Sequence, residues 1–326
     1  MSKIFITGGA GYVGSKLVPK LIEEGHEVTV FDLMLYGEDV IANHKNLSKI
    51  KGDIRDTNKL MNSITGHEIV IHLACISNDP SFELNPSLGK SINYDAFEPL
   101  VKISRESKVK KFIYASSSSV YGIKKEKNVT EDMKLEPLTD YSKFKADCEK
   151  ILKNYMSDDF IVTTLRPSTV CGYAKRQRLD VVVNILTNHA YHNRKIKVFG
   201  GDQLRPNVHI DDMVDSYLFV LNASSKKVNG EIFNVGFKNQ TVNELAFDVK
   251  DVLGDDIEII KSVSNDNRSY HVSSKKIEQI IGFKTQKTVK NAVTDLKNAF
   301  EKGLLPNSME DEKYFNIKRM NSIKLK

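Results

Sequence analysis

Short apolar segments alternate with longer segments of helical periodicity over the first 170 residues, and this alternation limits the fold more than any other feature. The expected strands cover 3–7, 27–32, 49–53, 68–75, 111–116 and 160–166. Between them, apolar residues recur at helical spacing, as at Leu17, Leu21 and Ile22. Strands that are separated by helices need right-handed crossovers and form a parallel sheet with helices on both faces. The sequence therefore predicts a doubly wound, Rossmann-type α/β fold.

The second half of the chain has a looser pattern, from which we expect a smaller C-terminal α/β part. A first domain is predicted at 1–168, joined by 207–237, because 231–235 has the composition of one more strand. A second domain is expected at 169–206 and 238–312, with a tail at 313–326. Because no low-complexity linker separates the two parts, they are expected to share one long interface.

Composition excludes several classes of protein. The most apolar run, 69–76, is too short to cross a membrane, and the chain enters a strand without a signal-peptide core, so we expect a cytoplasmic protein. Three widely spaced cysteines, Cys75, Cys148 and Cys171, predict neither a disulfide framework nor a zinc site, and no metal is expected. The net charge of +6 is dispersed without a basic stripe, so nucleic-acid binding is not expected.

The first predicted strand runs into a loop with Gly8, Gly11 and Gly14, which is followed by a helix. Glycines at this spacing let the backbone approach a pyrophosphate, although the triple alone also fits an ordinary turn. Here the next strand ends in Asp32, whose carboxylate can bind both hydroxyls of an adenosine ribose and repels a 2′-phosphate. NAD(H) is therefore favoured over NADP(H). Asp53 ends the third strand and either accepts from the adenine amino group or is a plain loop acid.

A second group of residues suits proton transfer. Tyr141 and Lys145 lie four residues apart on one face of a predicted helix, where the ammonium would favour the phenolate and lower the pKa of Tyr141. Such a pair alone is more often a solvated helix face. Ser117 and its neighbouring serines support a proton-transfer site, because they follow a strand at the edge where parallel sheets bind ligands.

Together these segments resemble the extended short-chain dehydrogenases/reductases, in the branch of nucleotide-sugar epimerases and dehydratases. The resemblance covers about residues 3–285 and includes His72-Leu73-Ala74, Arg166-Pro167 and 208–212. It implies that Tyr141 is the catalytic base, that Lys145 holds the nicotinamide ribose and that Ser117 binds the reacting hydroxyl. The cofactor-binding residues that it implies are Gly8, Gly11, Tyr12, Val13, Gly14, Asp32, Asp53, Ile54, Leu73, Ala74, Asn93, Tyr141, Lys145 and Pro167.

The implied substrate is a nucleotide-diphosphate sugar, whose diphosphate two guanidinium groups can hold. Two polar loops, 77–80 and 175–178, are expected to face the sugar, although each could instead be a solvated loop. The candidate substrate-binding residues are Ser77, Asn78, Ser117, Ser118, Arg178, Arg205 and Arg268.

Two serines limit the set of reactions that we expect. The 4,6-dehydratases of this branch carry Asp and Glu directly after the catalytic hydroxyl, whereas this chain has Ser118 and Ser119, so elimination of water is not expected. Oxidation at carbon 4 of a hexose or heptose then leads to epimerisation, which we favour because it restores NAD, or to release of the 4-keto sugar by a dehydrogenase, for example on a GDP-heptose. Surface polysaccharide biosynthesis is the expected setting. A protein that senses NAD without catalysis would not need the residues Ser117, Tyr141 and Lys145.

Two helices, expected at 93–107 and 141–155, carry more apolar residues than one sheet face needs. The resemblance implies that they pair across a two-fold axis into the four-helix bundle of a homodimer. Burial within the subunit under the C-terminal part is the alternative explanation.

Overall fold

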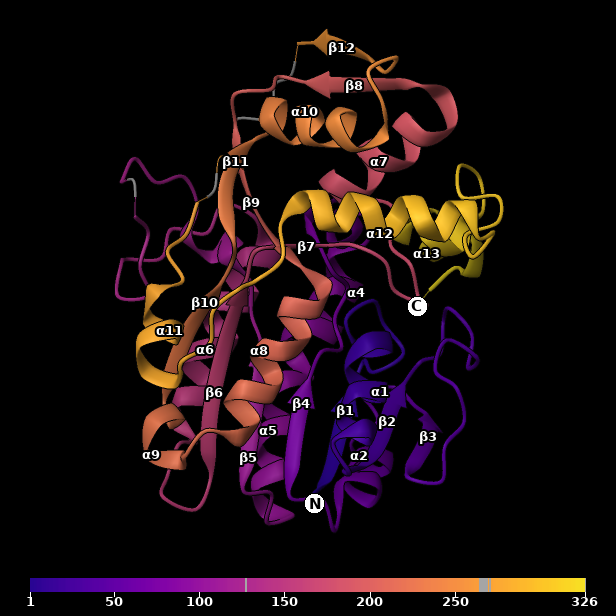
Figure 1. The fold of residues 1–326 in the computed structure, drawn as a ribbon. Helices are drawn as coiled ribbons and strands as arrows, with labels where there is room; N and C mark the ends of the chain where they lie inside the picture. Colours follow the sequence, from indigo (N-terminus) through magenta and orange to yellow (C-terminus); the bar gives the residue numbers. More distant parts are fainter. Residues whose placement is uncertain (127, 264–268, 270, 326) are drawn as a thin grey trace.

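The structure, a computed structural model, describes the chain except for residues 127, 264–268, 270 and 326. Its large sheet consists of β1 (Lys3–Thr7), β2 (Glu27–Asp32), β3 (Leu47–Lys51), β4 (Ile69–His72), β5 (Lys111–Ala115), β6 (Ile161–Pro167) and β10 (Glu231–Val235). All seven strands are parallel, in the order β10-β6-β5-β4-β1-β2-β3 (Figure 1). The chain reverses its direction of progress across the sheet between β1 and β4, and ligands of such sheets bind beside this point.

Helices cover both faces of the large sheet, because successive residues of a strand point to opposite faces. In β1, Ile4 and Ile6 join the apolar cluster on one face, and Phe5 joins the cluster on the other. The first cluster is covered by α1 (Gly14–Glu23) and α8 (Ile210–Asn222), and the second by α2 (Thr57–Ile64), α5 (Phe97–Glu106) and α6 (Asp140–Asn154).

The smaller part of the molecule lies beyond the carboxyl ends of the large sheet, at the top of Figure 1. Its strands are β7 (Thr169–Cys171), β8 (Lys195–Phe199), β9 (Leu204–His209), β11 (Lys238–Thr241) and β12 (Glu258–Ser262), in one sheet of three strands and one of two. Its helices α7 (Val182–Asn193), α10 (Val242–Leu253) and α12 (Val289–Glu301) share an apolar cluster with Leu186, Leu245 and Val293. The predicted fold class is therefore confirmed. Of the segment 207–237, which was predicted to join the first domain, only β10 extends the large sheet. Strand β9 pairs instead with β7 and β11 in the smaller part.

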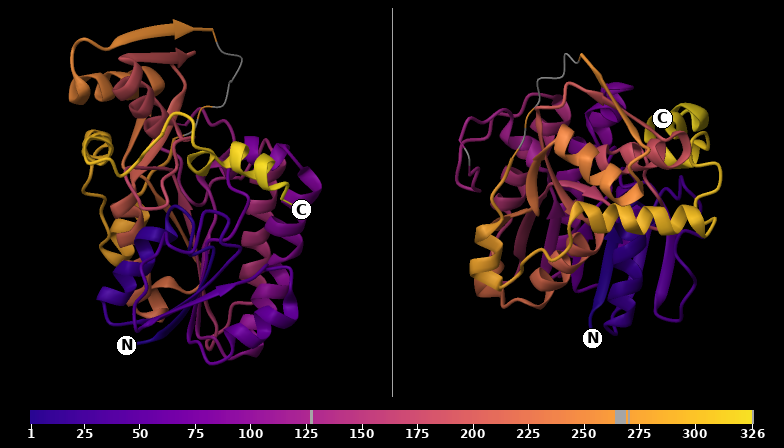
Figure 2. Two further views of the ribbon diagram at one scale, coloured as in Figure 1. Left: turned by 90° about the vertical axis from the view of Figure 1, so that its right-hand side faces the viewer. Right: turned by 45° about the horizontal axis from the view of Figure 1, so that its top comes forward.

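Short helical segments connect these elements. They are α3 (Asp79–Glu83), α4 (Pro86–Lys90), η1 (Ser91–Asp95), η2 (Ser118–Tyr121), α9 (Ser225–Val228), α11 (Lys275–Ile281), η3 (Glu312–Tyr314) and α13 (Asn316–Ile323). The last of them, in the region expected to be a tail, folds back beside α3 and the loops of the large sheet (Figures 1 and 2). None of the described helices is long and apolar enough to cross a membrane.

Most apolar residues of α5 and α6 are buried inside the subunit. Phe97 and Val101 of α5 and Cys148 of α6 are completely buried. They belong to one apolar cluster with residues of the large sheet, of α2 and of the C-terminal part, including Met320, so burial within the subunit accounts for these three residues. Partly exposed apolar residues do remain, namely Phe144 and Ile151 on α6 and Tyr94 and Tyr155 beside these helices.

Candidate active site

A cavity of about 390 Å³ lies where the carboxyl ends of the central strands meet the smaller part. Its walls are the glycine loop, the loops after β2, β3, β4, β5 and β6, and residues of α6 and α13. Most of the predicted site residues line it, namely Gly8, Gly11, Tyr12, Val13, Gly14, Asp32, Asp53, Ile54, Leu73, Ala74, Ser77, Asn78, Ser117, Ser118, Tyr141, Lys145, Pro167 and Arg178. The structure thus brings the predicted cofactor and proton-transfer residues into one site.

At Gly8 the backbone of the glycine loop lies so close to the loop after β4 that no side chain fits between them. A Cβ atom on Gly8, whose φ is +74°, would lie 2.4 Å from the backbone nitrogen of Ala74. A Cβ on Gly14 would lie 2.3 Å from the carbonyl oxygen of Gly9, so glycine lets α1 begin against the turn. The Tyr12 hydroxyl donates to the carbonyl oxygen of Gly172 at 2.5 Å and ties this loop to the smaller part.

Asp32 holds both neighbouring loops. Its two carboxylate oxygens accept from the backbone N–H groups of Ala10, at 3.0 Å, and Met34, at 2.8 Å. Burial raises the pKa of Asp32, while these two hydrogen bonds lower it. An ionised carboxylate has about four acceptor positions, so it can still accept from ribose hydroxyls.

The Asp53 carboxylate is less available to accept a hydrogen bond from the adenine amino group. Its carboxylate forms an ion pair with Arg55 at 2.6 Å. Burial acts to raise the pKa of Asp53, but the hydrogen bonds and charge of Arg55 outweigh it and lower the pKa. Ile54 beside it is buried and presents an apolar wall.

Arg176 lines the cavity, although the sequence analysis selected only Arg178 from the polar loop 175–178. It is 4% exposed, and its guanidinium lies 3.6 Å from the centre of the Tyr36 ring. Its Nη2 donates to Asn316 Oδ1 at 2.6 Å, whereas Nε and Nη1 have no hydrogen-bond partner among the described residues. A buried cation with unused N–H donors on two of its nitrogens suits an anion such as a phosphate of NAD. The residues present therefore fit the predicted cofactor.

Asn93 lies behind the cavity wall instead of lining it. Its Oδ1 accepts from the backbone N–H of Ile76 at 2.8 Å, and its Nδ2 donates to the carbonyl oxygen of the same residue at 2.9 Å. Asn93 therefore supports the loop after β4 from behind the cavity wall.

The proton-transfer residues lie on one wall of the cavity. Ser117 follows β5, and Tyr141 and Lys145 come from the first turns of α6. The Lys145 ammonium lies 5.9 Å from the centre of the Tyr141 ring and donates to the carbonyl oxygen of Ala115 at 2.7 Å. This bond fixes the Lys145 side chain beneath the site.

The expected lowering of the Tyr141 pKa is not found. Burial raises the pKa of this phenol, and the charges of Cys75 and Asp79 raise it further, whereas Arg178 acts in the opposite direction. Tyr141 is only 9% exposed, so loss of solvation outweighs the effect of nearby cations.

Only some of the predicted substrate-binding residues line the cavity. Arg178 pairs with Asp180 at 2.6 Å and donates from Nη1 to Ser77 Oγ at 3.0 Å, which joins the two predicted polar loops. Arg205 does not line the cavity but donates to the carbonyl oxygen of Leu204 on β9. Arg268 lies outside the described residues.

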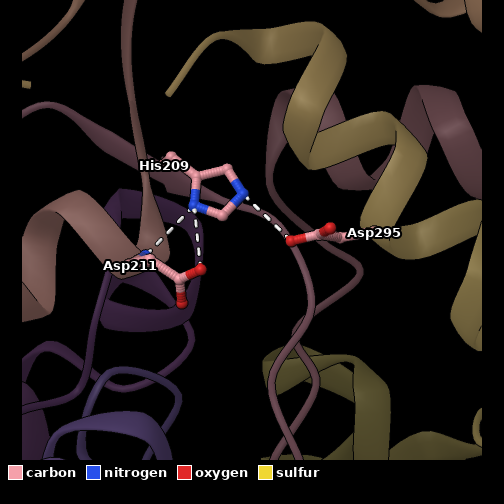
Figure 3. Close-up of side chains that lie close together, drawn as sticks. All are labelled: His209, Asp211 and Asp295. Carbon is pink, nitrogen blue, oxygen red and sulfur yellow. Dashed lines mark hydrogen bonds and ion pairs between the residues drawn. The ribbon is translucent and has the colours of Figure 1, made fainter. Parts of the chain in front are cut away.

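His209, Asp211 and Asp295 lie close enough to hold a metal ion (Figure 3). However, Asp211 already pairs with Lys16 at 2.9 Å and with Lys287 at 2.5 Å. His209 Nδ1 accepts from the backbone N–H of Asp211, so the proton of a neutral ring lies on Nε2, which faces Asp295 at 3.2 Å. These contacts indicate that the three residues connect the beginning of α8 to α12.

Comparisons with known proteins identify the family of the chain. Residues 4–236 match the model of the NAD dependent epimerase/dehydratase family. UDP-glucose 4-epimerase of Lactobacillus helveticus is 28% identical over 303 residues, which cover 86% of this chain and 92% of that protein. Human dTDP-D-glucose 4,6-dehydratase is 30% identical over 246 residues, covering 72% and 69%.

A solved structure is similar over nearly the whole chain. The crystal structure of UDP-glucose 4-epimerase with UDP-glucose from Thermotoga maritima has a TM-score of 0.85 and 26% sequence identity. The similarity covers 93% of this chain and 99% of that one. The family match, which includes the glycine loop, Asp32, Ser117, Tyr141 and Lys145, leads to one conclusion: the chain belongs to the NAD dependent epimerase/dehydratase family, whose members are NAD-dependent enzymes acting on nucleotide sugars.

Proposed function

We propose that the protein is a nucleotide-sugar epimerase that inverts carbon 4 of a nucleotide-linked hexose or heptose, in surface polysaccharide biosynthesis. The observation that carries this proposal is the composition of one cavity wall. Ser117, Tyr141 and Lys145 face the same cavity as Asp32, while Ser118 and Ser119 stand where dehydratases of this branch carry an acid and a base.

The residues have distinct roles in this reaction. When bound, NAD⁺ supplies the acceptor for the hydride that leaves carbon 4. Tyr141, as the phenolate that Lys145 would hold, takes the proton of the carbon 4 hydroxyl and becomes a neutral phenol. Ser117 Oγ shares a hydrogen bond with the same oxygen, and Lys145 also holds the nicotinamide ribose. Return of hydride to the opposite face of the keto-sugar completes the epimerisation.

The substrate contacts are proposed from the two polar loops and two arginines. Ser77, Asn78 and Arg178 would contact the sugar, because they line the cavity beside Tyr141. Arg205 and Arg268 would hold the diphosphate, which requires the substrate to extend from the cavity toward β9.

The reaction is tested by incubating the enzyme with UDP-, GDP- and dTDP-sugars in deuterated water and analysing the products by NMR and mass spectrometry. A carbon 4 epimer of unchanged mass is expected. A product two mass units lighter with accumulating NADH would instead identify the 4-dehydrogenase, and loss of water would identify a dehydratase. No conversion of any sugar, with NAD bound, would favour the NAD-sensing alternative.

A single substitution tests the role of the site. Tyr141→Phe removes the hydroxyl and is expected to lower kcat by about 10²-fold or more, as for other positioned proton-transfer groups, while NAD stays bound. The matched control is Tyr155→Phe, whose hydroxyl donates to Glu98 on the surface. Unchanged turnover of Tyr141→Phe would remove Tyr141 from the mechanism.

We further propose a cytoplasmic homodimer that pairs α5 and α6 of two subunits. Its support within the chain is the partly exposed apolar group beside these helices, in which the rings of Tyr94 and Phe144 stack at 5.0 Å. Light scattering should give twice the monomer mass at micromolar concentration, and Phe144→Glu should shift the protein toward monomer. A monomeric wild-type protein would contradict the dimer.

A further inference from the structure

The ammonium of Lys145 is a buried charge without a carboxylate partner. The residue is 4% exposed and forms no ion pair with any acidic residue that the structure describes. It donates to the carbonyl oxygen of Ala115 at 2.7 Å, which uses one of the three N–H donors of an ammonium. A cation that has lost its water in this way needs another source of compensation.

The ring of Tyr114 supplies a second contact. Lys145 Nζ lies 5.0 Å from the centre of this ring and 5.9 Å from the centre of the Tyr141 ring. Both distances fall within the range of about 6 Å over which the negative face of an aromatic ring attracts a cation, and the attraction is stronger where water is excluded. Lys145 therefore contacts two phenol rings, of which only Tyr141 lines the cavity.

The Tyr114 ring is itself held firmly. Tyr114 belongs to β5, is 1% exposed, and stacks on the ring of His72 with the ring centres 5.8 Å apart. The ring of Phe97 lies 4.7 Å away between centres. Burial raises the pKa of Tyr114 well above its usual value, so this phenol stays neutral. A fixed and neutral ring can define the position of Lys145 Nζ without competing for a proton.

Two other titratable side chains close to Lys145 also carry no charge. Burial and the charge of Lys145 lower the pKa of His72 to about 3, so its imidazole is neutral. Burial raises the pKa of the Cys148 thiol to about 12, although Lys145 acts to lower it. The positive charge of Lys145 is therefore not matched by an anion at these positions and is available to a negative charge that forms on Tyr141.

The remaining titratable groups act on the two phenols from α6 itself and from segments packed against it. Glu149, which acts on Tyr114, is paired with Arg166 at 2.6 Å. Those that act on Tyr141 are Cys75, Asp79 and Arg178. All of them stay in place when only Tyr114 is replaced, so a changed pH profile would report on Lys145.

We propose that Tyr114 is a positioning residue of the reaction, whose ring holds the Lys145 ammonium beside Tyr141, where this charge favours the phenolate that takes the carbon 4 proton. The proposal rests on the proposed function, because it needs Tyr141 to act as the base. Tyr114 does not line the cavity and adds no chemical step of its own.

The ring can be removed while an apolar side chain is kept. In Tyr114→Leu, the acid limb of the kcat profile, which reports the ionisation of Tyr141 in the enzyme–substrate complex, should move about one unit to higher pH. At neutral pH kcat should then fall about tenfold, with KM for the sugar changed less than about threefold. Tyr114→Met also lacks a ring and repeats the test if the leucine variant folds poorly. Tyr114→Phe keeps the ring and should keep the wild-type acid limb.

A second ring of the same strand is the matched control. Phe112 lies two residues before Tyr114 on the same face of β5, is completely buried, and packs against Phe97 and Phe160. Phe112→Leu therefore removes a similar amount of core packing, but not the ring that contacts Lys145. It should keep the wild-type pH profile, whatever its stability to urea.

A double variant separates action through Lys145 from support of the fold. In a Lys145→Met background the charge that Tyr114 positions is absent, so adding Tyr114→Leu should lower kcat by less than about threefold more. A further tenfold loss in that background would show that the ring acts on the structure and not through Lys145.

Three results would overturn the proposal: an unmoved acid limb in Tyr114→Leu, an equal shift in Tyr114→Phe, or an equal shift in Phe112→Leu. If the wild-type enzyme converts no nucleotide sugar, it is the proposed function that has failed, and NAD titration then decides the role of the ring. Because Lys145 is proposed to hold the nicotinamide ribose, Tyr114→Leu should weaken NAD binding about threefold or more relative to Phe112→Leu. Equal NAD affinities in these two variants would count against the positioning role.

Discussion

Asn316, ten residues from the C-terminus, donates from Nδ2 to Ser77 Oγ in the loop after β4, at a distance of 3.1 Å. The same side chain accepts from the Tyr36 hydroxyl at 2.9 Å and from Arg176 at 2.6 Å. One residue of α13 thus joins three loops around the cavity, and Met320 of the same helix lines it. The end of the chain is a wall of the cofactor site.

Asn316→Ala is therefore expected to release NAD faster. Loss of three hydrogen bonds, each contributing about 1 kcal/mol, should raise the dissociation rate at least about tenfold. Retention of NAD after dialysis and displacement kinetics would measure this. Asn321→Ala, in an exposed position of the same helix, is the control. Equal dissociation rates in both variants would show that α13 does not hold the cofactor.

Arg176→Met should weaken NAD binding without unfolding the protein. The variant keeps an apolar side chain over Tyr36 but removes the N–H donors of the two nitrogens that have no partner among the described residues. A charged hydrogen bond contributes about 1.5–3 kcal/mol, which corresponds to a loss of about 10- to 100-fold in affinity. Isothermal titration calorimetry with NAD is the measurement. Arg176→Lys should recover only part of the loss, because an ammonium lacks the forked donors; full affinity in the Met variant would contradict a phosphate contact.

Asp32 should make the enzyme prefer NAD over NADP. A 2′-phosphate would meet the half-buried Asp32 carboxylate, where repulsion between like charges is less screened than in bulk water. Asp32→Ser removes this charge while Arg176 remains nearby, so the ratio of NAD to NADP affinity should fall by about tenfold or more. Because Asp32 also holds the backbone of Ala10 and Met34, the ratio is the informative quantity and not either affinity alone. A wild-type ratio below one would contradict this role.

The predicted site residues that line the cavity belong to local patterns. The glycine loop, Asp32 and the strand ends follow from alternation and spacing, and Tyr141 and Lys145 follow from one helical turn, so short-range chemistry was enough to bring them to one cavity. The bounds of β3 and β4 shifted by a few residues, which is where such patterns are least specific.

The parts that were missed depend on contacts between distant segments. Nothing in the sequence near Asn316 indicates that it meets Ser77, 239 positions away. The direction of the Tyr141 pKa also depends on how deeply the phenol is buried, which spacing to Lys145 does not reveal. Asn93 was placed at the cofactor for a similar reason, because a motif gives a position along the chain but not which neighbour uses the side chain.

His72, at the end of β4, should make stability depend on pH. Burial and the charge of Lys145 lower its pKa from 6.5 to about 3, so the ring is neutral in the folded protein, where its Nδ1 contacts Thr7 Oγ1 at 2.7 Å. Below pH 6.5 the unfolded chain binds a proton that the folded protein does not, and stability is lost as pH falls from 6.5 toward 3. Between pH 6.5 and 4.5 this amounts to about 2–3 kcal/mol. Urea unfolding at both pH values should show that His72→Asn, whatever its stability at pH 6.5, loses less stability on acidification than the wild type by about that amount. Parallel losses in the two proteins would mean that His72 binds its proton equally in the folded and unfolded states.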